Sequence, residues 1–542
     1  MSRFGDHLMI VPVVLPLFVG AVMLALGGER RRNVNAALSV ATTFVLVMVA
    51  IALVQGADAS PTGVLGVYRL GGWFAPFAVV LVVDRLAAAM ALLTSILAAA
   101  AVVFSIARWH RVGVFFHPLF QFLLMGINGA FLTGDLFNLF VFFEVLLTAS
   151  YGLALYGSGT ARVMAALHYI VINLSASLLF LIGVSLIYGV CGTLNMADLA
   201  SRIPSIRVED RALAEAGAGI LGIAFLVKAG MWPLCFWLPA TYAAAPPPVA
   251  AIFAILTKVG AYIVLRLWLL LFGDAAGASA QFGGEWLLLG GIATIAFGAI
   301  GSLASQDMAR LAAFSVLVSS GTVLAAIGMG QAGVTGAALF YLISSTLGLA
   351  AFFLLIELVE RGREPGADML AVTRELYGEE HDLDDAEEVG IALPATMGML
   401  GLTFIACALM ISGLPPLSGF IAKFALLASA LNPQGMQAGI VSAAAWTLVV
   451  MLILSGLAAL IAMTRAGIRV FWASPDRAVP RVRLVEMAPV AILLLLCLML
   501  TIQAGPILRF TQATAQSLHA PHDYIRAVLG TVEGSNGATG GT

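Results

Sequence analysis

Only three lysines occur in the sequence, and their positions suggest proton chemistry. Lys228, Lys258 and Lys423 all lie inside long apolar runs, whereas every other basic residue is arginine or histidine. A charge in the middle of a bilayer costs at least about 2.5–3.5 kcal/mol. Arginine stays protonated when it is buried, but a buried lysine can release its proton near neutral pH. The use of lysine at these positions therefore predicts groups that hold and release a proton.

A carboxylate in another apolar run is a candidate partner for the lysines. Glu144 lies midway along FLTGDLFNLFVFFEVLLTASYG, between aromatic and aliphatic neighbours. His168, near the start of the next run, could extend a proton path because its ordinary pKa is near neutral. The alternative is a static buried ion pair, which seldom stabilises much because desolvation offsets the attraction. Three buried lysines are more than that alternative explains. The predicted ion path comprises Glu144, Lys228, Lys258, Lys423 and His168.

Two glycine–proline motifs echo each other in different apolar runs. Gly230-Met-Trp-Pro233-Leu recurs as Gly413-Leu-Pro415-Pro416-Leu, each with a lysine close by. Proline removes a helix hydrogen bond and glycine loosens the helix further, so each motif predicts a helix broken inside the membrane. A simple kink with no ion nearby is the alternative. Paired broken helices in an inverted repeat indicate the ion site of a transporter, because backbone freed within lipid must line a protein or water cavity.

The composition requires lipid around most of the chain. The chain has 542 residues, of which 61% are hydrophobic and 10% charged, and its mean hydropathy is +1.03. A soluble protein of this length carries roughly 25% charged residues, so the polar residues here could not cover a surface in water. The net charge of -2 gives no case for a nucleic-acid partner. We expect an all-α polytopic membrane protein in contact with membrane lipid.

Fourteen apolar runs are long enough to span a bilayer. They lie near 8–27, 35–55, 84–107, 115–133, 135–156, 163–190, 213–243, 246–272, 285–304, 307–329, 333–359, 390–429, 437–473 and 485–509. The runs 213–243, 390–429 and 437–473 exceed one span and are expected to be bent, tilted or extended. The two broken runs are spans 7 and 12, which run in opposite directions because successive spans alternate. The repeat is therefore predicted to be inverted in topology, with units in spans 4–8 and 9–13.

Charges in the loops predict the orientation. Arginine gathers after odd-numbered spans, at Arg30, Arg31, Arg32, Arg108, Arg111, Arg162, Arg465, Arg469, Arg477, Arg481 and Arg483. Cytoplasmic loops carry an excess of basic residues, so we expect both termini on the outer face. A cleavable signal would have its basic cluster before the first apolar run, not after it. Asp84, Asp307 and Arg310 are expected at the interface, and Arg266 is expected to reach it from span 8.

The apolar runs divide the chain into four segments. These are 1–110 with spans 1–3, 111–273 with the first repeat, 283–475 with the second repeat, and 476–542 with span 14 and the tail. The acidic cytoplasmic loop 362–389 (GEEHDLDDAEE) is expected to be a solvated face, with a docking role as the alternative. We expect a hairpin over 67–84. An amphipathic helix and a disordered tail, SNGATGGT, are expected after residue 510.

The four cysteines do not support a metal or redox centre. Cys191, Cys235, Cys407 and Cys497 are far apart, lie in or beside apolar runs, and form no Cys-x-x-Cys spacing. A lone cysteine in a membrane protein is usually a small apolar filler. We therefore predict no bound metal and no other cofactor in this chain.

The order of these residues resembles that of the antiporter-like membrane subunits. These subunits are shared by Mrp-type multisubunit cation/proton antiporters and the proton-pumping arm of respiratory complex I. The resemblance rests on glutamate in span 5, lysine before the break in span 7, TKVGAY (257–262) in span 8 and GLPPLSGFIAKF (413–424) in span 12. It covers about residues 8–510. Lys423 and the long acidic loop favour the D-type subunits of the Mrp antiporters, which are also called Mnh or Pha.

The resemblance implies roles for the buried charges. Glu144 and Lys228 would form the glutamate–lysine pair of the first half-channel. Lys258 would link the two halves, and Lys423 would be the exit lysine of the second. It also implies a transporter subunit rather than an enzyme, working in a bacterial inner membrane with other subunits of an antiporter complex, on protons and Na+ or K+. A proton-pumping subunit of an NADH dehydrogenase- or hydrogenase-type complex is the alternative. A structural scaffold is a third, which the buried lysines disfavour.

One position departs from the pattern of the family. Relatives usually carry a histidine in the middle of span 11, where this chain reads FYLISSTLGLAAFF with Ser344 and Ser345. Serine has no group that titrates near neutral pH, but it can hold a water. We therefore expect a water site at these serines, and a proton route through the second half-channel that is rerouted or less active.

Overall fold

The described part of the chain contains twelve helices that are long and apolar enough to cross a membrane, which confirms a multi-pass helical membrane protein. The computed structural model describes residues 7–27, 29–73, 75, 79–361, 395–432, 441–472 and 480–530. Three shorter apolar helices also lie in these ranges, and each coincides with part of an apolar run of the sequence: Val11–Ala25, Phe116–Leu132 and Ser418–Leu431.

The helices follow the apolar runs because a helix satisfies its own backbone hydrogen bonds within lipid. In the first half of the chain they are α2 (Val11–Ala25), α3 (Arg32–Ala59), α4 (Arg85–Ile106), α5 (Phe116–Leu132), α6 (Leu136–Ala154), α7 (Thr160–Cys191), α8 (Met196–Arg202), α9 (Val208–Ala229), α10 (Trp237–Ala244) and α11 (Pro247–Phe272). In the second half they are α12 (Gly284–Ala304), α13 (Met308–Gly328), α14 (Ala332–Glu360), α16 (Ala395–Ser412), α17 (Ser418–Leu431), α18 (Ala443–Gly467), α19 (Leu484–Ile502), α20 (Ala504–His519) and α21 (His522–Leu529).

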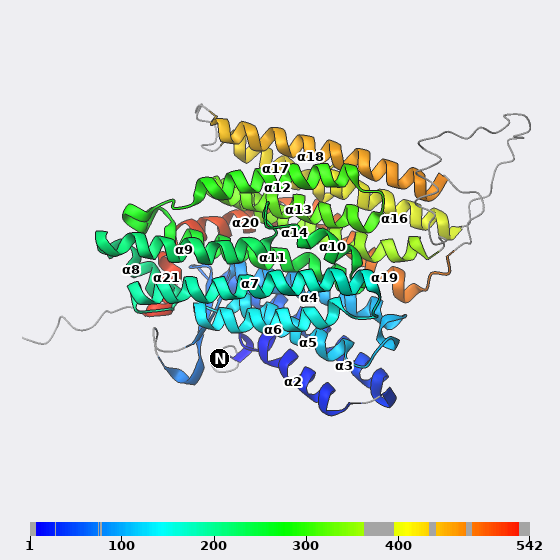
Figure 1. Cartoon of the computed structure of the whole chain (residues 1–542), viewed down its shortest axis with the longest axis horizontal. Coiled ribbons are helices and arrows are strands. Elements are labelled where there is room, and N and C mark those ends of the chain that lie inside the picture. The colour runs from blue at the N-terminus through cyan, green and yellow to red at the C-terminus, as the bar shows by residue number, and fades with distance from the viewer. Residues whose placement is uncertain are drawn as a thin grey trace, which may run out of the picture.

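The long helices lie side by side with their axes roughly aligned (Figure 1). α2 and α3 lie along one edge of the bundle and α18 lies along the opposite edge, and α19 then returns to pack against α4 and α14. α11 lies near the centre, and its most apolar window is entirely buried within the protein. A charged side chain on α11 is therefore shielded from lipid by neighbouring helices.

Two helix pairs pack through the same kind of contact. A Cβ on Gly129 of α5 would lie 2.2 Å from the ring of Phe142 on α6, and a Cβ on Gly301 of α12 would lie 2.2 Å from the ring of Phe314 on α13. Small residues allow this close approach of helices in membranes. Gly301 follows Gly129 by a fixed number of residues. The start of α13 follows the start of α6 by the same number, and so does the start of α14 after the start of α7. We call it the repeat interval, because the spacing of these helices recurs after it.

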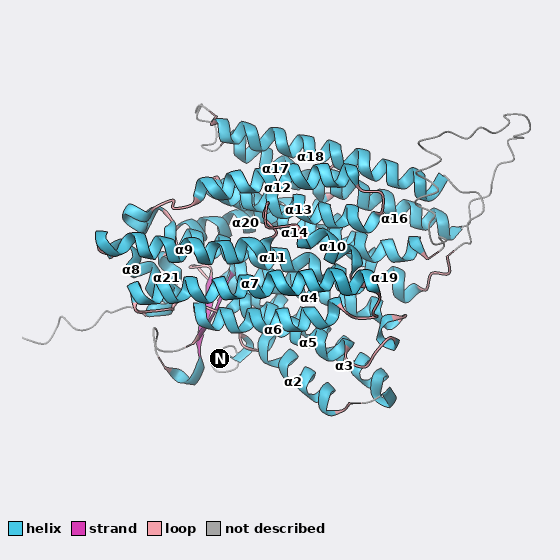
Figure 2. Ribbon diagram, viewed as in Figure 1, coloured by secondary structure: helices cyan, strands magenta, loops and turns pink. Residues whose placement is uncertain are grey.

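The predicted hairpin is present at one end of the bundle. β1 (Val64–Arg69) pairs with the antiparallel strand β2 (Val80–Asp84). The strands lie at the same end as α8 and α21 (Figure 2), and α21 contacts both of them. Asp84 ends β2 and caps α4, because its side chain accepts a hydrogen bond from the backbone N–H of Ala87 at 2.9 Å.

The last part of the described chain is helical, as expected from its amphipathic sequence. α20 packs against α14, and α21 follows it after a short turn. The acidic loop 362–389 and the tail SNGATGGT lie outside the described residues.

Candidate functional site

The first glycine–proline motif breaks a helix, as the sequence predicts. α9 ends at Ala229, one residue after Lys228, and Gly230 follows with φ +71°. Glycine adopts this left-handed conformation without steric cost. The chain then runs through Pro233 without helical structure until α10 begins at Trp237. The break leaves backbone groups that need hydrogen-bond partners from elsewhere.

Helices from later in the chain supply these partners. Ser320 of α13 donates a hydrogen bond to the carbonyl of Ala229 at 2.5 Å. The backbone N–H of Trp232 donates to Thr294 Oγ1 of α12 at 2.8 Å. Both bonds satisfy backbone that the break has freed, with neutral hydroxyl groups. The side chain of Lys228 is not used for this purpose.

Lys228 and Glu144 interact electrostatically without a direct bond. Lys228 is only 5% exposed, and its Nζ has no hydrogen-bond partner among the described residues. It lies 5.2 Å from the centre of the Phe143 ring. The carboxylate of Glu144 acts electrostatically on Lys228, yet the ion pairs of the described residues, taken to 4.0 Å, do not include these two. Glu144 Oε1 is also buried without a partner in the described chain. The two groups therefore interact through their charges without forming an ion pair within 4.0 Å.

Lys258 lies in the most enclosed helix and beside the first break. It is 0% exposed, and its Nζ donates a long hydrogen bond of 3.5 Å to Thr257 Oγ1. A Cβ on Gly260 would lie 2.6 Å from the backbone nitrogen of Ala229. The glycine of the TKVGAY motif therefore lets α11 contact the end of α9, next to Lys228. The structure thus brings the first and second lysines into neighbouring positions.

The second glycine–proline motif also breaks a helix, but its lysine is used differently. α16 ends at Ser412, Gly413 follows with φ +78°, and α17 begins at Ser418 after Pro415 and Pro416. The Nζ of Lys423 donates hydrogen bonds to the carbonyl of Ser412 at 2.8 Å and to that of Ile411 at 3.3 Å. An ammonium at a helix C-terminus is favoured by the helix dipole. Lys423 therefore caps the first half of its own broken span.

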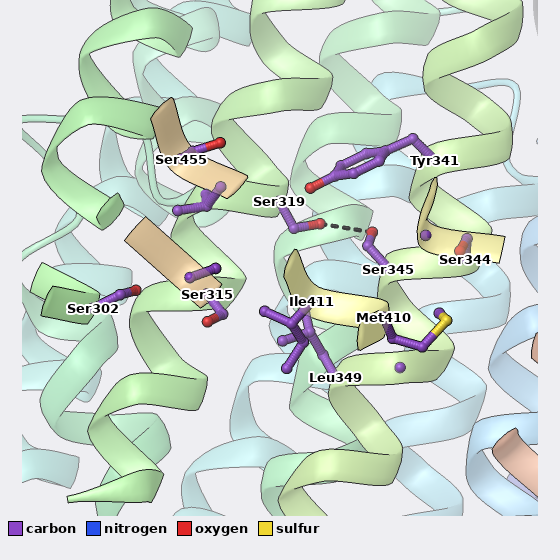
Figure 3. A pocket seen from close by; sticks show the side chains of 14 residues that line it. Ser302, Ser315, Ser319, Tyr341, Ser344, Ser345, Leu349, Met410, Ile411 and Ser455 are labelled. Carbon is purple, nitrogen blue, oxygen red and sulfur yellow. Dashed lines mark hydrogen bonds between the residues drawn. The ribbon is translucent and has the colours of Figure 1, made fainter. Parts of the chain in front are cut away.

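A cavity lined by hydroxyl groups lies beside the second break (Figure 3). Its volume is about 30 Å³, which is room for about two water molecules. The hydroxyl groups come from α12, α13, α14 and α18: Ser302, Ser315, Ser319, Tyr341, Ser344, Ser345 and Ser455. In the figure the Tyr341 hydroxyl points toward Ser319, and Ser319 is joined to Ser345 at 2.8 Å.

The two serines singled out by the sequence both line this cavity. Ser344 Oγ lies 2.9 Å from Ser418 Oγ at the start of α17, whereas Ser345 is bonded to Ser319 of α13. The pair thus links α14 to the broken span on one side and to α13 on the other. The space beside them is large enough for water, and their role as a water site stays a prediction.

The comparison with known families decides what kind of protein this is. Residues 133–451 match the family described as NADH:quinone oxidoreductase/Mrp antiporter, TM. The chain belongs to this family. The resemblance predicted from the lysines and the two motifs is therefore confirmed.

Individual members of the family match over nearly the whole chain. The protein is 60% identical over 533 residues to the D subunit of a probable K(+)/H(+) antiporter of Rhizobium meliloti (strain 1021), with 98% of each chain covered. It is 32% identical over 531 residues to the D subunit of an Na(+)/H(+) antiporter of Alkalihalophilus pseudofirmus, with 97% of this chain and 99% of that one covered. Among solved structures, it superimposes on a chain of the Mrp complex from Dietzia sp. DQ12-45-1b with a TM-score of 0.80 and 28% identity, covering 98% and 100% of the two chains.

One predicted site residue of this family member lies apart from the others. His168 is exposed on α7, and its Nδ1 lies 2.9 Å from the carbonyl of Met164 in the preceding turn. The neighbouring residue Tyr169 is the one that faces inward, where it meets Ser150 at 2.7 Å. The structure therefore does not bring His168 together with the lysines.

A buried charged pair between α11 and the start of α4 was missed, because Arg266 and Asp84 were each expected alone at the membrane interface; their depth in the membrane stays a prediction. Arg266 is 6% and Asp84 8% exposed. The guanidinium donates two hydrogen bonds to the carboxylate, at 2.5 and 2.8 Å, and a third to the Tyr262 hydroxyl at 3.2 Å. Tyr524 of α21 covers it at 5.2 Å. Opposite charges in two separate apolar runs are the signal that could have suggested the pair, because such charges are costly unless paired.

Proposed function

We propose that this chain is the ion-translocating subunit of a multisubunit monovalent cation/proton antiporter. It acts as a secondary transporter rather than an enzyme. Protons move through Glu144, Lys228, Lys258 and Lys423, and this movement is coupled to cation efflux. The observation that carries the proposal is the buried amine of Lys228, which lies at a broken helix, has no hydrogen-bond partner in the described chain and is within electrostatic reach of Glu144. A buried amine without a hydrogen-bond partner is costly. Passing its proton to a neighbouring acceptor lowers that cost, so such a lysine is suited to proton transfer.

The architecture that fits this function has fourteen spans in two inverted units. α9 with α10 forms span 7 and α16 with α17 forms span 12, so that each broken helix counts once. The first unit is residues 111–273 and the second is 283–475. The recurrence of helix starts after the repeat interval supports two units, and an offset of five spans makes their directions opposite. Paired broken helices at the interface of such units are typical of transporters.

The orientation follows from the arginine-rich loops. Both termini lie outside, and residues 1–110 and 476–542 flank the two units. The positive-inside rule supports this placement. The matched relatives come from bacteria, which supports the bacterial inner membrane as the location.

The partners are the other subunits of the complex, and the ions are protons with K+ or Na+. The names of the relatives supply the cations: K+ for the protein at 60% identity and Na+ for the one at 32%. The higher identity favours K+. The likeness to a chain of a solved Mrp complex supports assembly with further subunits.

The alternative is a proton-pumping subunit of a redox complex, because the family includes NADH:quinone oxidoreductases. Its lysines and carboxylate would serve the same proton path. The two functions differ in what drives the protons: a cation gradient for the antiporter and an electron donor for the redox complex. Cation-dependent proton flux in membranes without an electron donor therefore distinguishes them.

The test uses the whole complex, expressed with its partner genes in cells that lack other antiporters. Everted vesicles are energised, K+ or Na+ is added, and the loss of the pH gradient is read with a fluorescent dye. We expect Lys228→Ala and Glu144→Gln each to reduce antiport at least about a hundredfold while the complex still assembles. Lys228→Arg should fail too, since arginine does not release its proton.

The matched control is Glu209→Gln, an exposed carboxylate in the first turn of the same helix as Lys228. It should keep the rate of the unaltered complex. Full antiport in both Lys228→Ala and Glu144→Gln would remove these residues from the ion path. Activity in Lys228→Arg alone would reduce Lys228 to a fixed charge.

A further inference from the structure

Three of the hydroxyl groups around the cavity beside the second break present lone pairs to it. Ser302 donates its proton to the carbonyl of Gly298 and Ser315 to that of Leu311, both at 2.9 Å. Ser455 likewise donates to Leu452 at 2.9 Å. A serine hydroxyl has one proton and two acceptor positions. Once the proton is used within the helix, only acceptor oxygens are left for the cavity.

The oxygens gather next to the negative end of a half-helix. α16 ends at Ser412, and the side chain of Ile411 in its last turn lines the cavity. A helix C-terminus carries a partial negative charge. In transporters with broken helices, such ends and the unwound carbonyls next to them coordinate alkali cations. Acceptor oxygens beside a helix C-terminus are therefore the chemistry that replaces the hydration shell of a monovalent cation.

The cavity occupies the place in the second unit that the glutamate–lysine pair occupies in the first. Ser315 follows Phe143, the ring beneath Lys228, by the repeat interval. Ile411 follows Lys228 by the same number of positions as Gly413 follows Gly230, the two glycines of the breaks. The second unit thus has an aliphatic side chain and hydroxyls where the first has a buried amine beside an aromatic ring.

The group that could compete with a cation at this place is Lys423. Its ammonium is bonded to the carbonyls of Ile411 and Ser412, and Ile411 lines the cavity. Tyr341 is the titratable side chain among the described residues of the lining, which include no Asp, Glu, Lys, Arg or His. The helices that pack against α17 are α14, α16, α18 and α19. No charged side chain among their described residues interacts electrostatically with Lys423. The protonation state of Lys423 therefore determines the charge beside the cavity.

We propose that the cavity between α12, α13, α14, α16 and α18 binds the transported alkali cation, without most of its water, in exchange for the proton on Lys423. One proton leaves the ammonium as one monovalent cation enters, so the net charge of the site is unchanged. The cation takes the hydroxyl oxygens of Ser319 and Ser345 and the carbonyl end of α16 as ligands. Ser345 donates its proton to the carbonyl of Leu342 at 3.3 Å and so accepts from Ser319, which leaves a lone pair on each of the two oxygens. This inference rests on the proposed antiporter function and assigns its cation site to the second unit.

The test measures cation dependence in the complete complex reconstituted into liposomes, with K+ as substrate. For Ser319→Ala and Ser345→Ala we expect the KM for K+ to rise at least about tenfold, while kcat at saturating K+ changes less than about twofold. Binding of radioactive Rb+ to the purified complex gives a second measurement that does not need turnover. It should weaken by the same factor in these variants, and it should strengthen as the pH is raised, because Lys423 then loses its proton.

The control is Ser185→Ala, an exposed serine on α7 that bonds only its own helix, to Leu181 at 2.7 Å. It should leave KM and Rb+ binding unchanged. A fall in kcat with unchanged KM and unchanged Rb+ binding would overturn the proposal, because the hydroxyls would then carry only water or protons. A complex without any K+-driven proton flux would instead count against the antiporter function, and Rb+ binding would still show whether the cavity holds a cation.

Discussion

The two broken helices both turn at a glycine with positive φ but use their lysines in different ways. In the first, Ser320 satisfies the freed carbonyl of Ala229, and Lys228 is left without a hydrogen-bond partner among the described residues. In the second, Lys423 itself bonds the freed carbonyls of Ile411 and Ser412. The amine of the first lysine is free to bond water or another group that enters the site, whereas the amine of the second is hydrogen-bonded to its own span.

The lysines also differ in position. Lys228 lies two residues before Gly230, and Lys423 lies ten residues after Gly413. The residue that follows Glu144 by the repeat interval is Val316, so the sequence of the second unit has no carboxylate at the corresponding position. The repeated helix break is therefore a scaffold that supports two kinds of site. One holds an acid and an amine, and the other holds a tethered ammonium and a hydroxyl cavity.

The largest effect should come from exchanging the charges of the first site. Glu144→Lys and Lys228→Glu alone should each reduce antiport at least about a hundredfold, because each places two like charges together. The double variant should recover about a tenth of the original rate. Lys228 Nζ and Glu144 Oε1 have no hydrogen-bond partner in the described chain, so opposite charge rather than fixed geometry is what the pair requires. The measurement is antiport in everted vesicles, with assembly checked on native gels.

The double variant decides between two accounts of the first site. Recovery shows that the pair works through its charges. If the double variant assembles and is as inactive as the single ones, the order of acid and amine along the path matters instead. The same exchange has no counterpart in the second unit, where Val316 stands at the position that corresponds to Glu144.

A smaller effect should appear in stability, with opposite signs at the two breaks. Lys228→Met combined with Glu144→Gln removes a buried amine that has no hydrogen-bond partner among the described residues together with the charge it interacts with, and should raise the free energy of unfolding by about 1–3 kcal/mol. Lys423→Met leaves two carbonyls at the end of α16 without their donor, and should lower it by a similar amount of about 1–3 kcal/mol. The measurement is the temperature at which the detergent-solubilised complex loses its monodisperse peak after heating. Arg207→Met, an exposed position just before α9, serves as the control. Shifts of the same sign for both lysines would contradict the contrast between them.

The sequence predicted the spans and the breaks because both depend on local patterns. The length of an apolar run sets a span, and glycine followed by proline interrupts a helix wherever it falls. The pattern also selected Glu144 and the three lysines, since a charge in an apolar run needs a reason. All of these features can be recognised within about twenty residues of sequence.

What the sequence could not supply is which distant groups meet. Arg266 and Asp84 lie in separate spans and form a buried pair. Each looked interfacial, because its partner is remote in the sequence. The bonds from Lys423 to its own span were equally hidden, since the turn after Gly413 decides where the side chain points. Hydroxyl groups from four helices form one cavity only after the helices pack. Local patterns therefore identified candidate residues, and packing determined their partners.

The smallest effect should come from His168, which tests whether the path stays inside the first unit. His168 is exposed on α7, while the lysines are buried. His168→Gln keeps a polar side chain of similar size and removes the titratable ring, so the rate should stay within about twofold of the unaltered complex. The same vesicle assay at several pH values gives the rate and its pH profile. A loss of more than about tenfold in an assembled complex would place a proton step on the outward face of α7, where only a neighbouring subunit could complete it. An unchanged rate and pH profile would show that the proton path does not pass through His168. The path through Glu144 and Lys228 would then lie within this chain.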